Sequence, residues 1–443
     1  MGGVNFRIIS IDLFERDVRL RMPFRFGVVT LTEAPQAFVR ARIRLVDGRQ
    51  AEGAAAELLA PKWFDKNPAL SNEENFAQLR GSLRSARLRY LESGTRTAWA
   101  HSMPATGLVE NYGPALLDRA LLDALCRAIG MPFHEVIRRN LVGAEVFEGM
   151  NLETFFSALK PSTSIAARHT VGLVDPITAA DQKARVNDGL PETLEEVVAR
   201  YGHHWFKLKV GGDVKGDVER LSAIASVLDR STEPYRASLD GNEQYDDFEG
   251  VAALWSQMKA EARLKRLVGS IIFFEQPVKR QKALTEKVAG IDKPVIIDES
   301  DDSLGAFPRA RALGYMGVSS KTCKGIYKSL INASRCAAWG KGYFMSAEDL
   351  TIQAGLALQQ DLALVSLLGI THVERNGHHY VNGMADLPQG EQDAFLAVHA
   401  DLYERSHGAV RVKISNGDLA IGSLGCTGYA SAAMPDWNSM REM

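Results

Sequence analysis

Residues 235–300 decide the fold of this chain, because three apolar runs in this stretch each end in a carboxylate. The runs are YRASLD at 235–240, SIIFFEQ at 270–276 and PVIIDES at 294–300. Each run is short, the second and third are rich in β-branched or aromatic residues, and each is separated from the next by enough chain for a helix. The stretch therefore predicts consecutive βα units of a parallel sheet.

Further strand-like runs lie on both sides of this stretch. They occur at 167–175, 204–210, 315–320, 342–347 and 370–375, which brings the expected strands to eight. Eight units over roughly 200 residues match a (β/α)8 barrel at the short end of its range. The alternative is a doubly wound open sheet, but its Gly-rich phosphate turn is missing, since VGGD at 210–213 has two glycines only.

The two ends of the chain show other patterns. Residues 6–57 alternate like antiparallel strands, with Asp47-Gly48 as a hairpin signal, and residues 72–139 have helical spacing. After Leu402, the stretch 410–423 again resembles a hairpin that can return to the N-terminal sheet. We therefore expect an α+β part at 1–150, a (β/α)8-type barrel at 151–402 and a returning C-terminal segment at 403–443.

The composition excludes several classes of protein. The chain has 443 residues, of which 46% are hydrophobic and 24% charged, as in ordinary globular proteins. The formal charge is −2, without a basic cluster suited to nucleic acid, and no run approaches the ~20 apolar residues of a membrane span. The four cysteines are far apart, so neither a disulfide framework nor a zinc site is expected, and a cytoplasmic location fits best.

The carboxylates at the strand ends are the first candidate functional residues. Asp240, Glu275 and Asp298 each follow an apolar run, at the end of the strand where barrel enzymes build their active sites. Burying three like charges together is costly unless a cation lies among them. A hard divalent cation with oxygen ligands meets this requirement, so the sequence predicts a Mg²⁺ site.

Lysines form the second candidate group. Lys207 and Lys209 lie two residues apart in one expected strand, so both face the barrel interior and one of them can serve as a base. The sixth expected strand is followed by Lys321 and, three residues later, Lys324. A lysine at this strand end would face Lys207 and Lys209 across the metal. We favour Lys321 over Lys324, because the number of residues between Asp298 and Lys321 suits one βα unit.

Together, FKLKVGGD, SLDGNEQYD, FFEQPV, PVIIDES and VSSKTCKGI resemble the mandelate racemase and muconate lactonizing enzyme branch of the enolase superfamily. The resemblance implies an α/β fold, a modified (β/α)8 TIM barrel with an α+β capping domain formed by the N-terminal region and the C-terminal tail. It also implies that Asp240, Glu275 and Asp298 ligate Mg²⁺, with Asn242 and Glu299 nearby. Lys209 would be the main base, Lys207 its electrostatic support and Lys321 the opposite acid or base.

The chain departs from this branch at the last two strands. The seventh expected strand continues into Ser346, Glu348 and Asp349 without the histidine of the mandelate racemase and sugar-acid dehydratase groups. At the eighth, His372 and Glu374 stand where dipeptide epimerases have paired aspartates, which argues against a dipeptide substrate. Both are candidate substrate contacts.

Loops of the capping domain are expected to supply further specificity. The segments 22–30 and 54–64 fit loops that close over the barrel mouth, with Arg25, Glu57 and Lys62 as candidate contacts. The alternative for the aromatic residues of these segments is that they belong to the core of the cap.

The leading hypothesis is a Mg²⁺-dependent enzyme that abstracts the α-proton of a small carboxylate substrate through an enediolate, as a racemase, epimerase or cycloisomerase. A lyase acting on a sugar acid or amino acid, with Lys321 or His372 as acid, is the alternative within catalysis. A non-catalytic binding protein on the same fold and a Schiff-base aldolase are the alternatives of other classes. A homo-oligomer is expected for a barrel of this kind.

Overall fold

The computed structural model describes residues 2–348, 350 and 353–443. The N-terminal part is an antiparallel sheet in which β1 (Asn5–Phe26) pairs with β2 (Val29–Leu45), and β2 pairs with β3 (Gln50–Leu58). Because β1 and β2 extend to a tight turn at Gly27, the expected loop at 22–30 is the tip of a hairpin. The Asp47-Gly48 hairpin between β2 and β3 is confirmed.

Helices cover one face of this sheet. The long ones are α1 (Asn72–Leu91) and α3 (Leu108–Ile129), and α3 packs directly on β3. This approach requires small residues, since a Cβ on Gly53 would lie 2.1 Å from the backbone nitrogen of Ala124. The short elements β4 (Thr95–Thr97), α2 (Ala98–His101), α4 (Phe133–Arg138) and α5 (Leu152–Ala158) complete this part and lead to the barrel.

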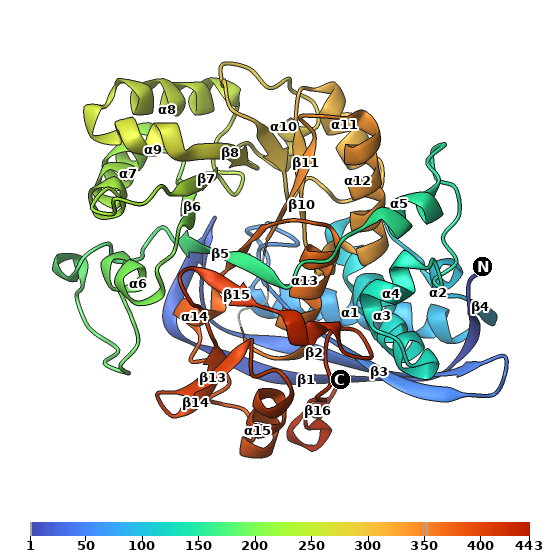
Figure 1. Cartoon of the computed structure of the whole chain (residues 1–443). Helices are drawn as coiled ribbons and strands as arrows, with labels where there is room; N and C mark the ends of the chain where they lie inside the picture. Colours follow the sequence, from blue (N-terminus) through green and yellow to red (C-terminus); the bar gives the residue numbers. More distant parts are fainter. Residues whose placement is uncertain (1, 349, 351–352) are drawn as a thin grey trace.

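The central part is a curled sheet of parallel strands with helices outside it (Figure 1). The eight expected strands are present as β5 (Ser164–Val171), β6 (Trp205–Lys209), β7 (Arg236–Asp240), β8 (Ile271–Glu275), β9 (Val295–Ile297), β10 (Gly317–Ser320), β11 (Phe344–Ala347) and β12 (His372–Arg375). They pair in the order β11-β10-β9-β8-β7-β6-β5-β12, and β11 also contacts β12. The modified (β/α)8 TIM barrel with an α+β cap is thus confirmed.

The helices between these strands vary in length. They are α6 (Leu194–Tyr201), α7 (Val214–Leu228), α8 (Phe248–Ala260), α9 (Lys265–Ser270), α10 (Arg280–Ala283), α11 (Ala306–Ala312), α12 (Ile326–Trp339) and α13 (Leu356–Leu367), followed after β12 by α14 (Gly377–Tyr380) and α15 (Gln389–Val398).

The C-terminal tail contacts both parts of the chain. β13 (Tyr403–Ser406) and β14 (Ala409–Val412) form a hairpin, whereas β15 (Asp418–Ala420) joins β5 of the barrel antiparallel. Of the hairpin expected at 410–423, the turn is present, since Ser415 and Asp418 form an isolated antiparallel bridge, but the flanking strands β14 and β15 pair with different strands. The last strand, β16 (Arg441–Glu442), does return to the N-terminal sheet and pairs with β1.

The hydrophobic core does not follow the boundaries of cap and barrel. One cluster joins the cap to the later strands, α12, α13 and the tail, and a second fills the outer layer between residues 171 and 318. Shared burial fixes the cap against the second half of the barrel, and the division at 150 and 402 remains a proposal.

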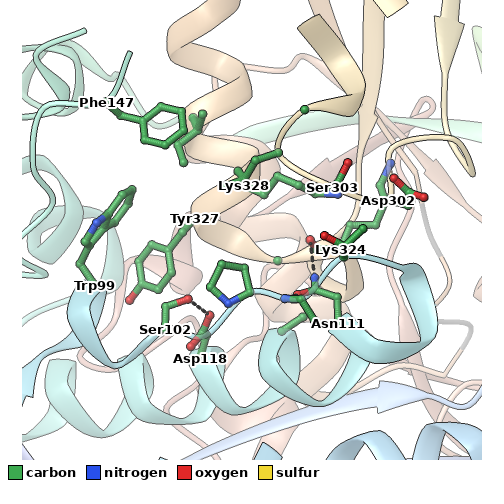
Figure 2. Close-up of a pocket in the computed structure, with 18 residues that line it drawn as sticks. Trp99, Ser102, Asn111, Asp118, Phe147, Asp302, Ser303, Lys324, Tyr327 and Lys328 are labelled. Carbon is green, nitrogen blue, oxygen red and sulfur yellow. Dashed lines mark hydrogen bonds between the residues drawn. The ribbon is translucent and has the colours of Figure 1, made fainter. Parts of the chain in front are cut away.

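Asp118 on α3 is a buried carboxylate of the cap, and among the described residues no lysine or arginine side chain forms an ion pair with it. It accepts hydrogen bonds from Tyr90 Oη (2.8 Å) and Ser102 Oγ (2.6 Å), the second of which is drawn in Figure 2. Burial, only partly offset by these two bonds, raises the pKa of Asp118 to about 7. The folded chain therefore holds a proton there that the unfolded chain releases near its ordinary pKa.

We expect the free energy of unfolding to fall as the pH rises from 5.5 to 8, by about 2 kcal/mol through Asp118 alone. An Asp118→Asn variant keeps the side-chain shape and should lose this part of the pH dependence, as measured by urea denaturation at both pH values. Asp386→Asn, at an exposed position, is the control. An unchanged pH dependence in Asp118→Asn would contradict the assignment.

Candidate active site

The strand ends of the barrel bring acidic and basic side chains to one level. Lys209 on β6 pairs in register with Asp240 on β7, and Asp240 pairs with Glu275 on β8. Asp298 follows the last residue of β9. All three carboxylates are buried. Because parallel strands end at the same edge, the sheet itself places these charges side by side.

Lys207 is the centre of this cluster. Its Nζ lies 2.8 Å from Asp240, 2.9 Å from Glu275, 2.6 Å from Glu348 and 2.9 Å from Glu374. Burial alone would lower the pKa of Lys207, but these four carboxylates raise it well above its ordinary value. Lys207 therefore stays protonated and holds together acids that would otherwise repel one another.

Glu275 has a different environment from the other acids. Its carboxylate is fully buried, and although one oxygen lies 2.9 Å from Lys207 Nζ, neither oxygen accepts a well-oriented hydrogen bond within the described residues. Burial and the neighbouring Glu348 raise the pKa of Glu275 well above its ordinary value. Nearby, Asn242 Oδ1 and Glu299 Oε2 also lack hydrogen-bond donors in this part of the chain.

Such oxygens fit a hard cation, because Mg²⁺ prefers carboxylate and carbonyl oxygen ligands. The predicted ligands Asp240 and Glu275 lie on either side of the Lys207 ammonium, whereas Asp298 pairs with Lys321 and Lys324. A metal ion bound between the acids would therefore replace Lys207 as partner of at least one of them.

Lys321 and Lys324 both contact Asp298 and are both buried. Lys321 Nζ lies 2.7 Å from Asp298 Oδ2 and 5.1 Å from the ring centre of Trp63, whereas Lys324 Nζ lies 3.2 Å from Asp298 Oδ1 and 3.4 Å from Asp301. Although burial opposes it, Asp298 raises the pKa of Lys321 above its ordinary value. Lys321 is thus held as an ammonium group beside the cap.

A cavity of about 30 Å³ lies between the cap and these strand ends. Its lining consists of Phe24, Phe26 and Trp63 from the cap, with Lys207, Lys209, Asn242, Asp298, Lys321, Leu350, Glu374 and Asn376 from the barrel. Lys209 and Lys321 therefore reach one cavity. A cavity of this volume admits water and not an organic acid.

Three of the predicted substrate contacts belong to this cavity or its edge. Asn242 and Glu374 line it, and Glu374 also accepts a hydrogen bond of 2.6 Å from Thr170. Glu299 lies behind Asn242, whose Nδ2 donates to it at 3.2 Å, and it pairs with Lys66 at 3.2 Å.

The other predicted contacts point elsewhere. Arg25 is exposed, because the strand alternation turns its neighbours Phe24 and Phe26 towards the cavity instead. Glu57 is buried against α3, where it pairs with Arg119 at 2.9 Å. Lys62 is bonded to backbone carbonyls of its own loop, at Asn67 (2.8 Å) and Leu70.

His372 also lies away from the cavity. It occupies the first position of β12, near the opposite end of the barrel, and stacks on Trp205 with ring centres 4.1 Å apart. The interpretation of His372 as a substrate contact is corrected here, because Glu374, two residues further along the same face, is the one that reaches the cavity. Asp349 lies outside the described residues.

Sequence reasoning assigned no role to Glu348 or Arg168, which complete the cluster. Glu348 follows β11 and is buried against Arg168 from β5, which also donates to Ser346 Oγ at 3.1 Å and Ala347 O at 3.0 Å. Glu348 could have been predicted from the sequence, because it lies at the end of a strand, as Asp240 and Glu275 do. Arg168 had no such signal inside its apolar run.

A second, larger cavity of about 550 Å³ lies between the cap and the barrel helix α12 (Figure 2). Trp99, Phe147 and Tyr327 line one side of it. Lys324 and Asn111 line the other, where Asn111 donates to the Lys324 carbonyl at 3.0 Å. Of the two lysines that follow β10, Lys324 therefore lines the larger cavity and Lys321 the smaller one.

Comparison with known proteins identifies the barrel. Residues 189–400 match the family model of the enolase C-terminal domain-like proteins. No curated protein matches the chain. No helix in the described part of the chain has the length and apolar character needed to cross a membrane.

Solved structures match the chain over almost its whole length. Muconate lactonizing enzyme from Mucobacterium Smegmatis, complexed with muconolactone, has a TM-score of 0.62 at 19% identity and covers 98% of each chain. Dipeptide epimerase from Cytophaga hutchinsonii, with Mg and D-Ala-L-Val, has a TM-score of 0.62 at 15% identity over 99% of each. N-succinyl Arg/Lys racemase from Bacillus cereus has a TM-score of 0.58 at 18% identity, over 85% of this chain and 89% of the racemase.

Removing the central cation tests the charge balance of the cluster. Lys207→Met leaves four buried acids without their shared ammonium group, and we expect it to lower the free energy of unfolding by about 3–5 kcal/mol. Mg²⁺ added to this variant should restore part of the loss, because it neutralises the same acids. Denaturant melts with and without Mg²⁺ measure both effects.

The control is Lys215→Met, at an exposed position, which should leave stability within about 0.5 kcal/mol of the parent. Equal stability of the two variants would show that Lys207 does not hold the acids together.

Proposed function

Because residues 189–400 match the family model of the enolase C-terminal domain-like proteins, we propose that this protein is a Mg²⁺-dependent enzyme that removes the α-proton of a carboxylate substrate. The reaction we favour is racemisation, epimerisation or cycloisomerisation through an enediolate. The observation that carries this proposal is that Lys209 and Lys321 line one cavity beside Asp240 and Asp298.

The two lysines suit a two-base reaction. Lys209 contacts one carboxylate, Asp240, at 2.5 Å, whereas Lys207 contacts four, so Lys209 has fewer ion pairs to give up on moving towards a substrate. In the proposal, Lys209 Nζ takes the α-proton from one face of the α-carbon, and the Lys321 ammonium group returns a proton to the opposite face. For the other stereoisomer the two roles exchange.

The acids supply the electrostatic part of the site. Asp240, Glu275 and Asp298 would hold Mg²⁺, which when bound to the substrate carboxylate offsets the charge that develops as the α-proton leaves. Asn242 and Glu374 line the cavity and would orient the rest of the substrate. Phe24, Phe26 and Trp63 would exclude water once the substrate is bound.

The relatives suggest which acids to test first. The similar structures are a muconate lactonizing enzyme with muconolactone, a dipeptide epimerase with D-Ala-L-Val and N-succinyl Arg/Lys racemase, and the compounds in question share a carboxyl group or its lactone form. Elimination with His372 as the acid has no support, because His372 stacks on Trp205 away from the cavity.

Solvent-deuterium exchange tests the proposal directly. The protein with Mg²⁺ is incubated in D₂O with dipeptides, N-succinyl amino acids and muconolactone, and α-deuterium is measured by NMR and mass spectrometry. We expect exchange with at least one class. Lys209→Ala should reduce exchange from one stereoisomer by at least about 10²-fold, and Lys321→Ala from the other. Lys215→Ala is the matched control.

Metal removal provides the second test. EDTA should abolish exchange and added Mg²⁺ should restore it, because without the cation the second negative charge on the substrate has no partner. Exchange that survives in both lysine variants would contradict the assignment of bases, and trapping of a substrate adduct by borohydride would indicate a Schiff-base enzyme instead.

A further inference from the structure

Three histidines from distant parts of the chain lie together outside the barrel interior. They are His169 on β5, His203 between α6 and β6, and His378 on α14. One ring nitrogen from each lies within 4.8 Å of the other two. None of them belongs to the carboxylate and lysine cluster.

The pleat of β5 places His169 on the side opposite the active site. Its neighbours Arg168 and Thr170 contact Glu348 and Glu374 inside the barrel, so the side chain between them faces outward. There it packs with His203 and His378, at ring-centre distances of 5.2 and 5.1 Å. The same strand therefore serves two different clusters on its two faces.

Hydrogen bonding fixes the tautomer of His203. Its Nδ1 lies 3.0 Å from the carbonyl oxygen of Ala167, and because a carbonyl only accepts, Nδ1 carries the hydrogen. Burial lowers the pKa of His203 to about 4, so the ring is neutral at neutral pH and Nε2 carries a lone pair. Nε2 is buried and has no donor within the described residues.

The arrangement around His203 is the one expected of a metal ligand, in which one ring nitrogen donates to a backbone carbonyl and the other is left for the ion. His169 Nδ1 and His378 Nε2 lie 3.0 Å apart and share one hydrogen in a hydrogen bond, which a bound ion would replace. Two nitrogens bound to one tetrahedral ion at ~2.0–2.1 Å would lie roughly 3.3 Å apart, so this pair already has nearly the required spacing. The third nitrogen lies within 4.8 Å of the other two, so it needs a shift of up to about 1.5 Å to reach this spacing.

We propose that His169, His203 and His378 form a binding site for a divalent transition-metal ion of the Zn²⁺ class, separate from the predicted Mg²⁺ site. Imidazole nitrogens select ions such as Zn²⁺, whereas the oxygen ligands of the barrel interior select Mg²⁺.

Access to this site lies at His378, which is partly exposed and lines a cavity of about 10 Å³ together with Tyr201, Gly377 and Arg411. Three protein ligands leave a fourth position of a tetrahedral ion for water. A bound ion would join the first strand of the barrel, the start of the second and the helix after the last. It would thereby fix the strand that carries Arg168 and Thr170 behind the active site.

Equilibrium dialysis tests the site. The chelator-stripped full chain is dialysed against Zn²⁺ with Mg²⁺ in large excess, so that oxygen-rich sites are occupied, and bound zinc is measured by mass spectrometry. We expect one equivalent of zinc and a higher Tm with Zn²⁺ than with Mg²⁺ alone. His378→Gln should bind zinc at least about tenfold more weakly. His204→Gln, beside His203 but exposed, should bind like the parent.

A spectroscopic measurement on the parent protein guards against a variant that fails to fold. Co²⁺ in place of Zn²⁺ should give the strong visible absorption of a tetrahedral ion with nitrogen ligands, which oxygen-ligated octahedral Co²⁺ does not show. Absence of retained zinc and of this absorption would overturn the proposal. Equal zinc binding by the parent and His378→Gln would overturn it as well, and neither result depends on the proposed enzymatic activity.

Discussion

The ammonium group of Lys207 is the interaction on which the interior of this barrel depends. Four acids contact it, contributed by β7, β8 and the ends of β11 and β12. Buried acids at this spacing repel one another, and they are stable only because cations from β5 and β6 lie among them. Two of these acids, Asp240 and Glu275, are also proposed ligands of Mg²⁺.

Cap and barrel act together because they share both a core and a cavity. One hydrophobic cluster runs from the cap sheet into the later strands of the barrel, so the cap cannot be displaced as a rigid whole without exposing that core. The hairpin tip with Phe24 and Phe26, together with Trp63, is the part of the cap that closes the cavity above Lys209 and Lys321.

The two faces of β5 illustrate how a barrel separates different chemistries. Inward side chains support the acids of the interior, whereas the outward His169 meets two other histidines. Oxygen-rich and nitrogen-rich sites can therefore exist within one residue of each other along the chain without competing for the same ion.

The amino-acid sequence by itself determined the βα order, the strand-end positions of Asp240, Glu275 and Asp298 and the inward direction of Lys207 and Lys209. These properties are local, since they follow from the period of two along a strand and from the common edge at which parallel strands end. The sequence also placed Lys321 and Lys324 at one strand end and favoured Lys321, through its sequence distance from Asp298, as the one that faces the interior.

Only the tertiary structure decided which side chains meet across the fold. It brought Glu348 to Arg168, turned Arg25 outward, stacked His372 on Trp205 and gathered His169, His203 and His378. These contacts join positions far apart in the chain, and they depend on how the sheet curls, how the cap packs on it and which rotamers the dense core leaves available. No pattern of neighbouring residues contains that information, because it arises only when the whole chain is packed.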